Sequence, residues 1–122
     1  MRIWLVIAAL LGGLGVIVGA VGAHAVKGLG PVQSHAFDTA TAFQMYHALA
    51  IGLSALVMRH SRAWATRAAW CFLVGIIFFS GSLYLWALNG QHVLVFMPPL
   101  GGLAFILGWG LLAVAGWKSE ER

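Results

Sequence analysis

The residues of this chain that could do chemistry lie mainly between positions 24 and 47, where polar side chains interrupt an apolar sequence. Four of these polar residues are spaced by three positions, from Asp38 to His47, and a histidine lies before them. The whole set is His24, Asp38, Thr41, Gln44 and His47. On a helix this spacing makes an oblique polar ridge, which we expect near the outer end of the second helix. Imidazoles at one depth could carry a proton or ligate haem or a metal. Unpaired polar groups are costly in hydrocarbon, so the same set could instead join two helices.

The sequence favours the joining role over chemistry. Neither a carboxylate pair nor an HxxxH spacing accompanies the two imidazoles, and Cys71 is the only cysteine. We therefore predict no metal site and no cofactor. A nucleophile–base pair, a phosphate loop and an acid pair are also absent from the sequence, so we expect no enzymatic activity. His24 is expected to cap the first helix within reach of Gln44 or His47.

The composition excludes a soluble domain. Hydrophobic residues make up 61% of the 122 residues and charged residues only 8%, whereas soluble proteins carry roughly 25% charged residues. The net charge is +4, but its seven basic residues are scattered between apolar runs and form no patch for nucleic acid. We therefore expect the lipid bilayer as the main partner and no nucleic-acid partner.

Four apolar runs are long enough to cross a membrane of about 30 Å. They predict an all-α, four-helix transmembrane bundle in one domain, with helices at about 3–23, 37–58, 65–88 and 98–117 and an outer loop at 24–36. The run before Ala23-His24-Ala25 is too long for a secretory signal, so we expect it to remain as a helix. Pro98 and Pro99 suit a first helical turn, which leaves residues 89–97 as an interfacial or partly re-entrant connection.

Basic residues predict the orientation. With both termini in the cytoplasm, the inner side carries Arg2, Arg59, Arg62, Arg67, Lys118 and Arg122, and the outer side only Lys27. This bias predicts an N-in, C-in protein of the bacterial inner membrane. Trp4, Trp64, Trp70 and Trp117 would then lie near the inner interface, and Tyr84 and Trp86 near the outer one. Trp109 is too deep for either belt, so we expect it between helices.

Glycines mark the faces on which helices are expected to pack. In lipid, small residues allow close backbone approach and dispersion contacts. The first run has four glycines within an arc of about 80°, and the last run repeats the pattern. The predicted packing set is Gly12, Gly15, Gly19, Gly22, Gly101, Gly102 and Gly108.

Four segments give the chain a resemblance to a known family. They are GAVGAHAVKG (19–28), FDTATAFQMYHALA (37–50), FFSGSLYLWAL (78–88) and PPLGGLAFILGW (98–109). In this order they closely resemble the bacterial domain-of-unknown-function 423 family, whose eukaryotic relatives are the transmembrane protein 256 proteins. The resemblance implies a four-helix integral protein of the bacterial inner membrane and implies no activity.

Two functions remain compatible with the sequence. The first is a non-enzymatic structural or accessory subunit that contacts other membrane-protein subunits, or copies of itself, through its glycine faces. The second is a small oligomeric transporter or channel that uses the outer His/Gln/Asp cluster. Nothing in the sequence identifies a partner or a substrate.

Overall fold

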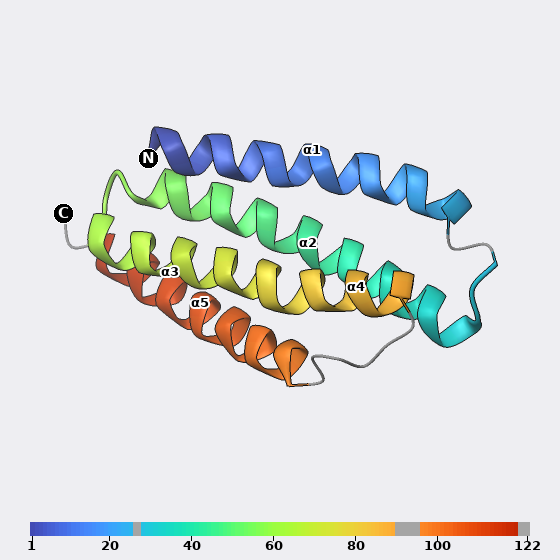
Figure 1. Ribbon diagram of the computed structural model, residues 1–122. Helices are drawn as coiled ribbons and strands as arrows, with labels where there is room; N and C mark the ends of the chain where they lie inside the picture. Colours follow the sequence, from blue (N-terminus) through green and yellow to red (C-terminus); the bar gives the residue numbers. More distant parts are fainter. Residues whose placement is uncertain (26–27, 90–95, 120–122) are drawn as a thin grey trace.

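The protein is a bundle of four membrane-crossing helices. The computed structural model describes residues 1–25, 28–89 and 96–119, and four helices among them are long and apolar enough to cross a membrane. The predicted all-α, four-helix transmembrane bundle is therefore confirmed. The spans run alternately up and down, so the start of the first and the end of the last lie at the same end of the bundle (Figure 1). Which side of the membrane this end faces stays a prediction from the basic residues.

The first two spans are α1 (Arg2–Ala25) and α2 (Pro31–Val57). Helix α2 begins six residues before the predicted start at residue 37, because Pro31 occupies its first turn, where the missing N–H is not needed. The predicted outer loop at 24–36 is correspondingly shorter. At its other end, the backbone N–H groups of His60 and Ser61 donate to the Val57 carbonyl and close the turn toward the third span.

The third span is continuous but contains a π-helical segment. It consists of α3 (Arg62–Gly75), η1 (Ile76–Ser80) and α4 (Gly81–Asn89). A π-bulge inserts into a helix and changes the facing of the residues that follow it. The π-helical segment ends at the buried Ser80, whose hydroxyl donates a hydrogen bond to the Ala40 carbonyl of α2 at 2.8 Å.

The last span is α5 (Met97–Ser119), with Pro98 and Pro99 in its first turn, as predicted. Residues 90–95, which make up most of the predicted interfacial connection, lie outside the described residues. The same applies to Lys27, the predicted outer charge.

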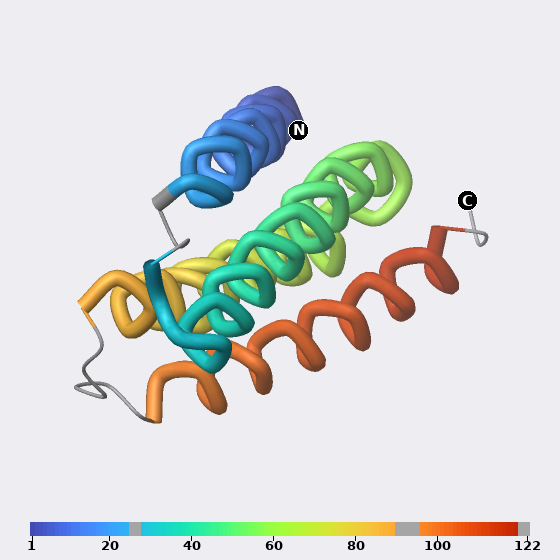
Figure 2. The backbone as a smooth tube through the Cα atoms, turned by 90° about the vertical axis from the view of Figure 1, so that its right-hand side faces the viewer, coloured from blue at the N-terminus to red at the C-terminus, as the bar shows by residue number. Residues whose placement is uncertain are grey.

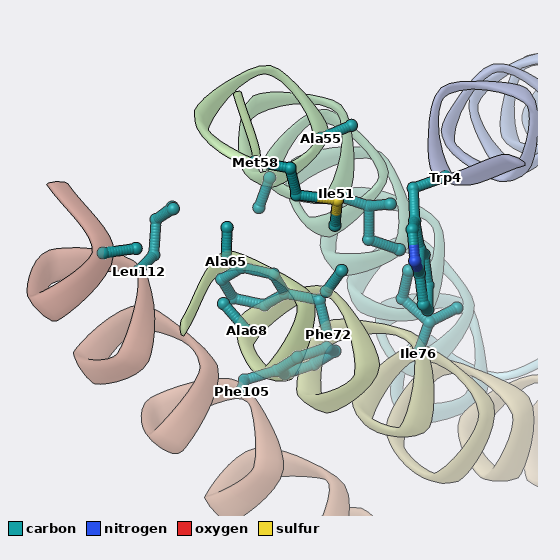
Figure 3. Packing of buried hydrophobic residues seen from close by; sticks show 13 residues of the cluster. Trp4, Ile51, Ala55, Met58, Ala65, Ala68, Phe72, Ile76, Phe105 and Leu112 are labelled. Carbon is teal, nitrogen blue, oxygen red and sulfur yellow. The ribbon is translucent and has the colours of Figure 1, made fainter. Parts of the chain in front are cut away.

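The helices form two packed pairs. Helix α1 packs on α2, α3 packs on α5, and α2 also contacts the third span. Figure 2 shows α1 and α5 on opposite sides of the bundle. Six of the thirteen residues in the main buried cluster are alanines, which lets the helices approach closely. Trp4 reaches from α1 into this cluster (Figure 3) and meets Trp70 edge to face at 5.0 Å.

Candidate functional site

The predicted polar ridge lies at the middle of the bundle, not near the outer end of α2. Gln44 has thirteen residues of α2 on either side, because the helix begins at Pro31 and ends at Val57. At 1.5 Å per residue it is about 20 Å from each end. Gln44 and His47 are both buried at this depth, with 3% and 4% of their surfaces exposed. Such groups must find partners within the bundle, since hydrocarbon offers none.

Gln44 joins three helices. Its side-chain Nε2 donates to the Leu11 carbonyl of α1 at 2.8 Å, and its Oε1 accepts from the Tyr84 hydroxyl of α4 at 2.6 Å. Tyr84 also lies 3.4 Å from the Thr41 hydroxyl, which itself donates to the Phe37 carbonyl. Tyr84 therefore points into the bundle, whereas its sequence position suggested the outer interface. The amide is used on both sides, so this group of residues acts as a tie between helices.

His47 belongs to a second group, on the side of α2 that faces α5. Its Nδ1 lies 2.7 Å from the Phe43 carbonyl, and its Nε2 lies 3.1 Å from the indole Nε1 of Trp109. An indole nitrogen can only donate. Nε2 must then accept, and Nδ1 must carry the hydrogen that it donates to Phe43. The ring stacks on Phe105 with centroids 3.6 Å apart and an angle of 10° between the planes.

This geometry fixes His47 as a neutral imidazole with both nitrogens in use. A metal or a haem iron would need the Nε2 lone pair, which already accepts the Trp109 N–H. A proton delivered to Nε2 would have to displace the same bond. The arrangement is therefore suited to holding α2 and α5 together.

The prediction that His24 lies within reach of Gln44 or His47 was wrong. Gln44 meets α1 at Leu11, thirteen residues before His24 and thus about 20 Å away along the helix. His24 is exposed, and so is Asp38, whose carboxylate faces away from the buried part of α2. The predicted set of five therefore divides. Thr41 and Gln44 share the tie to Tyr84, His47 belongs to the Trp109 group, and His24 and Asp38 lie outside both.

Two partners of these groups were missed by the sequence analysis. Tyr84 was read as an interfacial residue, and Trp109 was expected between helices but without a partner. A buried indole or phenol normally finds a hydrogen-bond partner, so a tryptophan too deep for the interface could have been matched with the polar ridge. Nothing in the sequence indicated that Leu11 would supply a carbonyl.

The predicted glycine set is partly used for close packing. A Cβ on Gly15 would lie 2.5 Å from Met45 Sδ, one on Gly19 would lie 3.4 Å from Thr41 Cγ2, and Gly22 lies against the Phe37 ring. In α5, Gly101 and Gly108 lie against Phe79 and Phe72. Gly12 and Gly102, however, have no atom within 4 Å of a Cβ, so neither packs closely against another helix of this chain. The arc of about 80° that contains the glycines of the first helix is too wide to separate packed positions from open ones.

Gly75 makes a contact of the same kind that the sequence analysis did not include. A Cβ at this position would collide with the Phe105 ring, the ring on which His47 stacks. The glycine thus creates the room in which Phe105 and His47 lie against each other.

The family described as "Protein of unknown function (DUF423)" matches residues 18–102, a range that includes Thr41, Gln44, His47 and Tyr84 but not their partners Leu11, Phe105 and Trp109. The chain belongs to this family. It is 36% identical to the UPF0382 membrane protein SAB0533 of Staphylococcus aureus over 121 residues, which cover 97% of this chain and 98% of that protein. It is also 36% identical to the UPF0382 inner membrane protein YgdD of Escherichia coli K12, over 99% and 94% of the two chains.

These similarities extend over nearly the whole bundle. With the four spans, they identify the chain as a multi-pass protein of the inner membrane. No solved structure matches the chain.

Proposed function

We propose that this protein is a non-enzymatic accessory subunit that binds a transmembrane helix of a larger membrane complex. The observation that carries the proposal is an open face of α5 with small residues. Gly102, Gly110 and Gly116 have no atom within 4 Å of a Cβ, and Ala113 is exposed on the same side. The packed residues of α5, among them Gly101 and Gly108, are centred about 120° away around the helix.

The face has the properties that favour helix association in lipid. Small residues let a second backbone come close, where dispersion and weak contacts replace the absent hydrophobic drive. Leu103 and Ile106, exposed at 63% and 70%, lie on the same side of α5 and would contact the approaching helix. The glycine row of α1 supports no such contact, because Gly15, Gly19 and Gly22 are already used within the chain.

The polar groups support a structural role over transport. Throughout the described residues, each buried side-chain nitrogen and oxygen has a hydrogen-bond partner. The alternative, a small oligomeric transporter or channel, is favoured by the depth of Gln44 and His47, because transporters often bind substrate near the midplane. A transported solute would then have to replace the present hydrogen-bond partners of Gln44 and His47.

The test is gentle detergent extraction from the native membrane followed by native mass measurement. We expect a second membrane protein bound to the 13.0 kDa chain, and its recovery should fall at least tenfold in Gly110→Leu. The matched control is Gly13→Leu, which places the same side chain on an open position of α1 and should not change recovery. Equal recovery of the second membrane protein with Gly110→Leu and with Gly13→Leu would contradict the proposal.

Two further outcomes would also replace the proposal. Masses at multiples of 13.0 kDa only would indicate self-association. Proton or solute flux in liposomes containing the purified protein, abolished by His47→Gln, would favour the transporter.

A further inference from the structure

A groove between α1 and α2 opens on the side of the bundle away from α5. Its volume is about 520 Å³, within the range of roughly 300–1,000 Å³ that is usual for ligand sites. The lining is apolar and includes Leu5, Ala8 and Gly12 of α1 and Ala48, Gly52 and Leu56 of α2. The small residues form the floor of the groove, since a Cβ on Gly12 would meet no atom within 4 Å.

The groove has the depth of one leaflet of the bilayer. Its lining on α2 runs from Met45 to Leu56, which is about 17 Å along the helix axis. Half of a hydrocarbon core is about 15 Å. The groove ends near the middle of the bundle, because at Gly15 the Met45 side chain fills the space between the two helices. It can therefore take one acyl chain but not the full length of a transmembrane helix.

Two exposed arginines lie just beyond the end of the groove that is farther from the middle of the bundle. Arg2 precedes Leu5 by three residues of α1, which is about 4.5 Å along the helix, and Arg59 lies in the turn after α2, three residues beyond Leu56. Helix α1 begins and helix α2 ends at the same end of the bundle (Figure 1). The one acidic residue among the described ranges, Asp38, is about 30 Å away along α2, so no carboxylate of those ranges lies beside these arginines.

We propose that the groove and these arginines bind one anionic phospholipid. An acyl chain lies along Ala8, Gly12, Ala48 and Gly52, and the phosphate lies between Arg2 and Arg59. Guanidinium groups bind phosphate oxygens through paired, charge-assisted hydrogen bonds. The charge at the mouth favours this occupant over a second helix, because a phosphate complements the two arginines and an apolar helix does not. The inference is independent of the proposed α5 face, which lies on the other side of the bundle.

The first experiment measures selectivity for the headgroup. Delipidated protein in dodecyl maltoside is titrated with phosphatidylglycerol or phosphatidylcholine of the same acyl chains, and bound lipid is counted by native mass spectrometry. We expect one molecule of phosphatidylglycerol per chain, with at least tenfold preference. A juxtamembrane arginine contributes to anionic lipid binding by about fivefold in affinity, so Arg2→Gln with Arg59→Gln should lower the affinity about thirtyfold. Lys118→Gln, an exposed cation at the same end on α5, should leave it unchanged.

The second experiment blocks the groove without altering its charge. Gly12→Leu places a large side chain in the groove at a position where its Cβ meets no protein atom, and Gly13→Leu places the same side chain at a second open position beside it. We expect Gly12→Leu to lose the bound lipid at least tenfold and Gly13→Leu to retain it, with equal thermal unfolding of the two variants in lipid-free detergent. Equal lipid binding by the two variants, or equal binding of both headgroups, would overturn the proposal. So would a chain dimer that Gly12→Leu dissociates, since a second copy would then occupy the groove.

Discussion

Helices α1 and α5 both lie at the edge of the bundle, yet they are attached in different ways. In α5, aromatic residues and glycines interlock: Phe105 lies against Gly75, and Gly108 against Phe72. In α1, the contacts are a row of glycines facing α2, the hydrogen bond from Gln44 to the Leu11 carbonyl, and Trp4, which meets Trp70 edge to face. Accordingly, 11% of the apolar window of α1 is buried within the protein, against 28% for α5.

Glycines in these two rows therefore need not respond alike when a larger side chain replaces them. At Gly101 the nearest atom to a Cβ would be the backbone nitrogen of Phe79, at 2.5 Å. At Gly15 the nearest atom, also at 2.5 Å, is the Met45 sulfur, at the flexible end of a side chain. A methionine can repack, whereas backbone cannot move without moving its helix. The α5 contact at Gly101 is therefore rigid, and the α1 contact at Gly15 can adapt.

The largest effect is expected from Gly101→Leu. The new side chain would collide with the backbone of η1, so we expect a loss of about 3 kcal/mol in the free energy of unfolding, at the upper end of overpacking costs. Gly102→Leu, on the open side of the same helix, should change it by less than about 0.5 kcal/mol. Unfolding in mixed micelles with sodium dodecyl sulfate measures both. If Gly15→Leu costs as much as Gly101→Leu, the two sides do not differ in rigidity.

A smaller effect is expected from His47→Leu. It removes the acceptor of the Trp109 N–H and the ring that stacks on Phe105, and we expect a loss of about 1–2 kcal/mol. A double-mutant cycle with Trp109→Phe isolates the pair, because removing both partners leaves no donor unpaired. The coupling should be about 0.6 kcal/mol or more. Additive effects of the two substitutions would show that the hydrogen bond contributes nothing to the attachment of α5.

The smallest effect is expected at His24. Since it is exposed and about 20 Å from Leu11 along α1, both His24→Gln and His24→Leu should change the free energy of unfolding by less than about 0.5 kcal/mol. The same mixed-micelle assay applies. A selective loss in His24→Leu, with His24→Gln unchanged, would show that His24 has a buried polar partner after all.

The sequence was sufficient to locate the four membrane spans, but it did not show which side chains contact one another between them. Apolar length and the proline pair at Pro98 located the start of the fourth helix within a residue, and Pro31 could have located the start of the second by the same rule. Periodicity identified Gln44 and His47 as one ridge, but it cannot show that they face different helices. That division depends on where Tyr84 and Trp109 lie, which is determined by the packing of the third and fourth spans. For the same reason, Gly75 could not be recognised without knowing where Phe105 points.

The central claim is that α1 is a peripheral helix held by few ties, while α2, the third span and α5 form the stable part. Amide hydrogen exchange resolved by helix, in detergent micelles, tests it most directly. We expect α1 amides around Leu11 to exchange through openings at least 1 kcal/mol lower in free energy than those of α3 and α5. Gln44→Leu should lower the α1 value by about a further 0.6–1.7 kcal/mol and leave α5 unchanged. Equal protection of α1 and α5, with a uniform response to Gln44→Leu, would contradict the account.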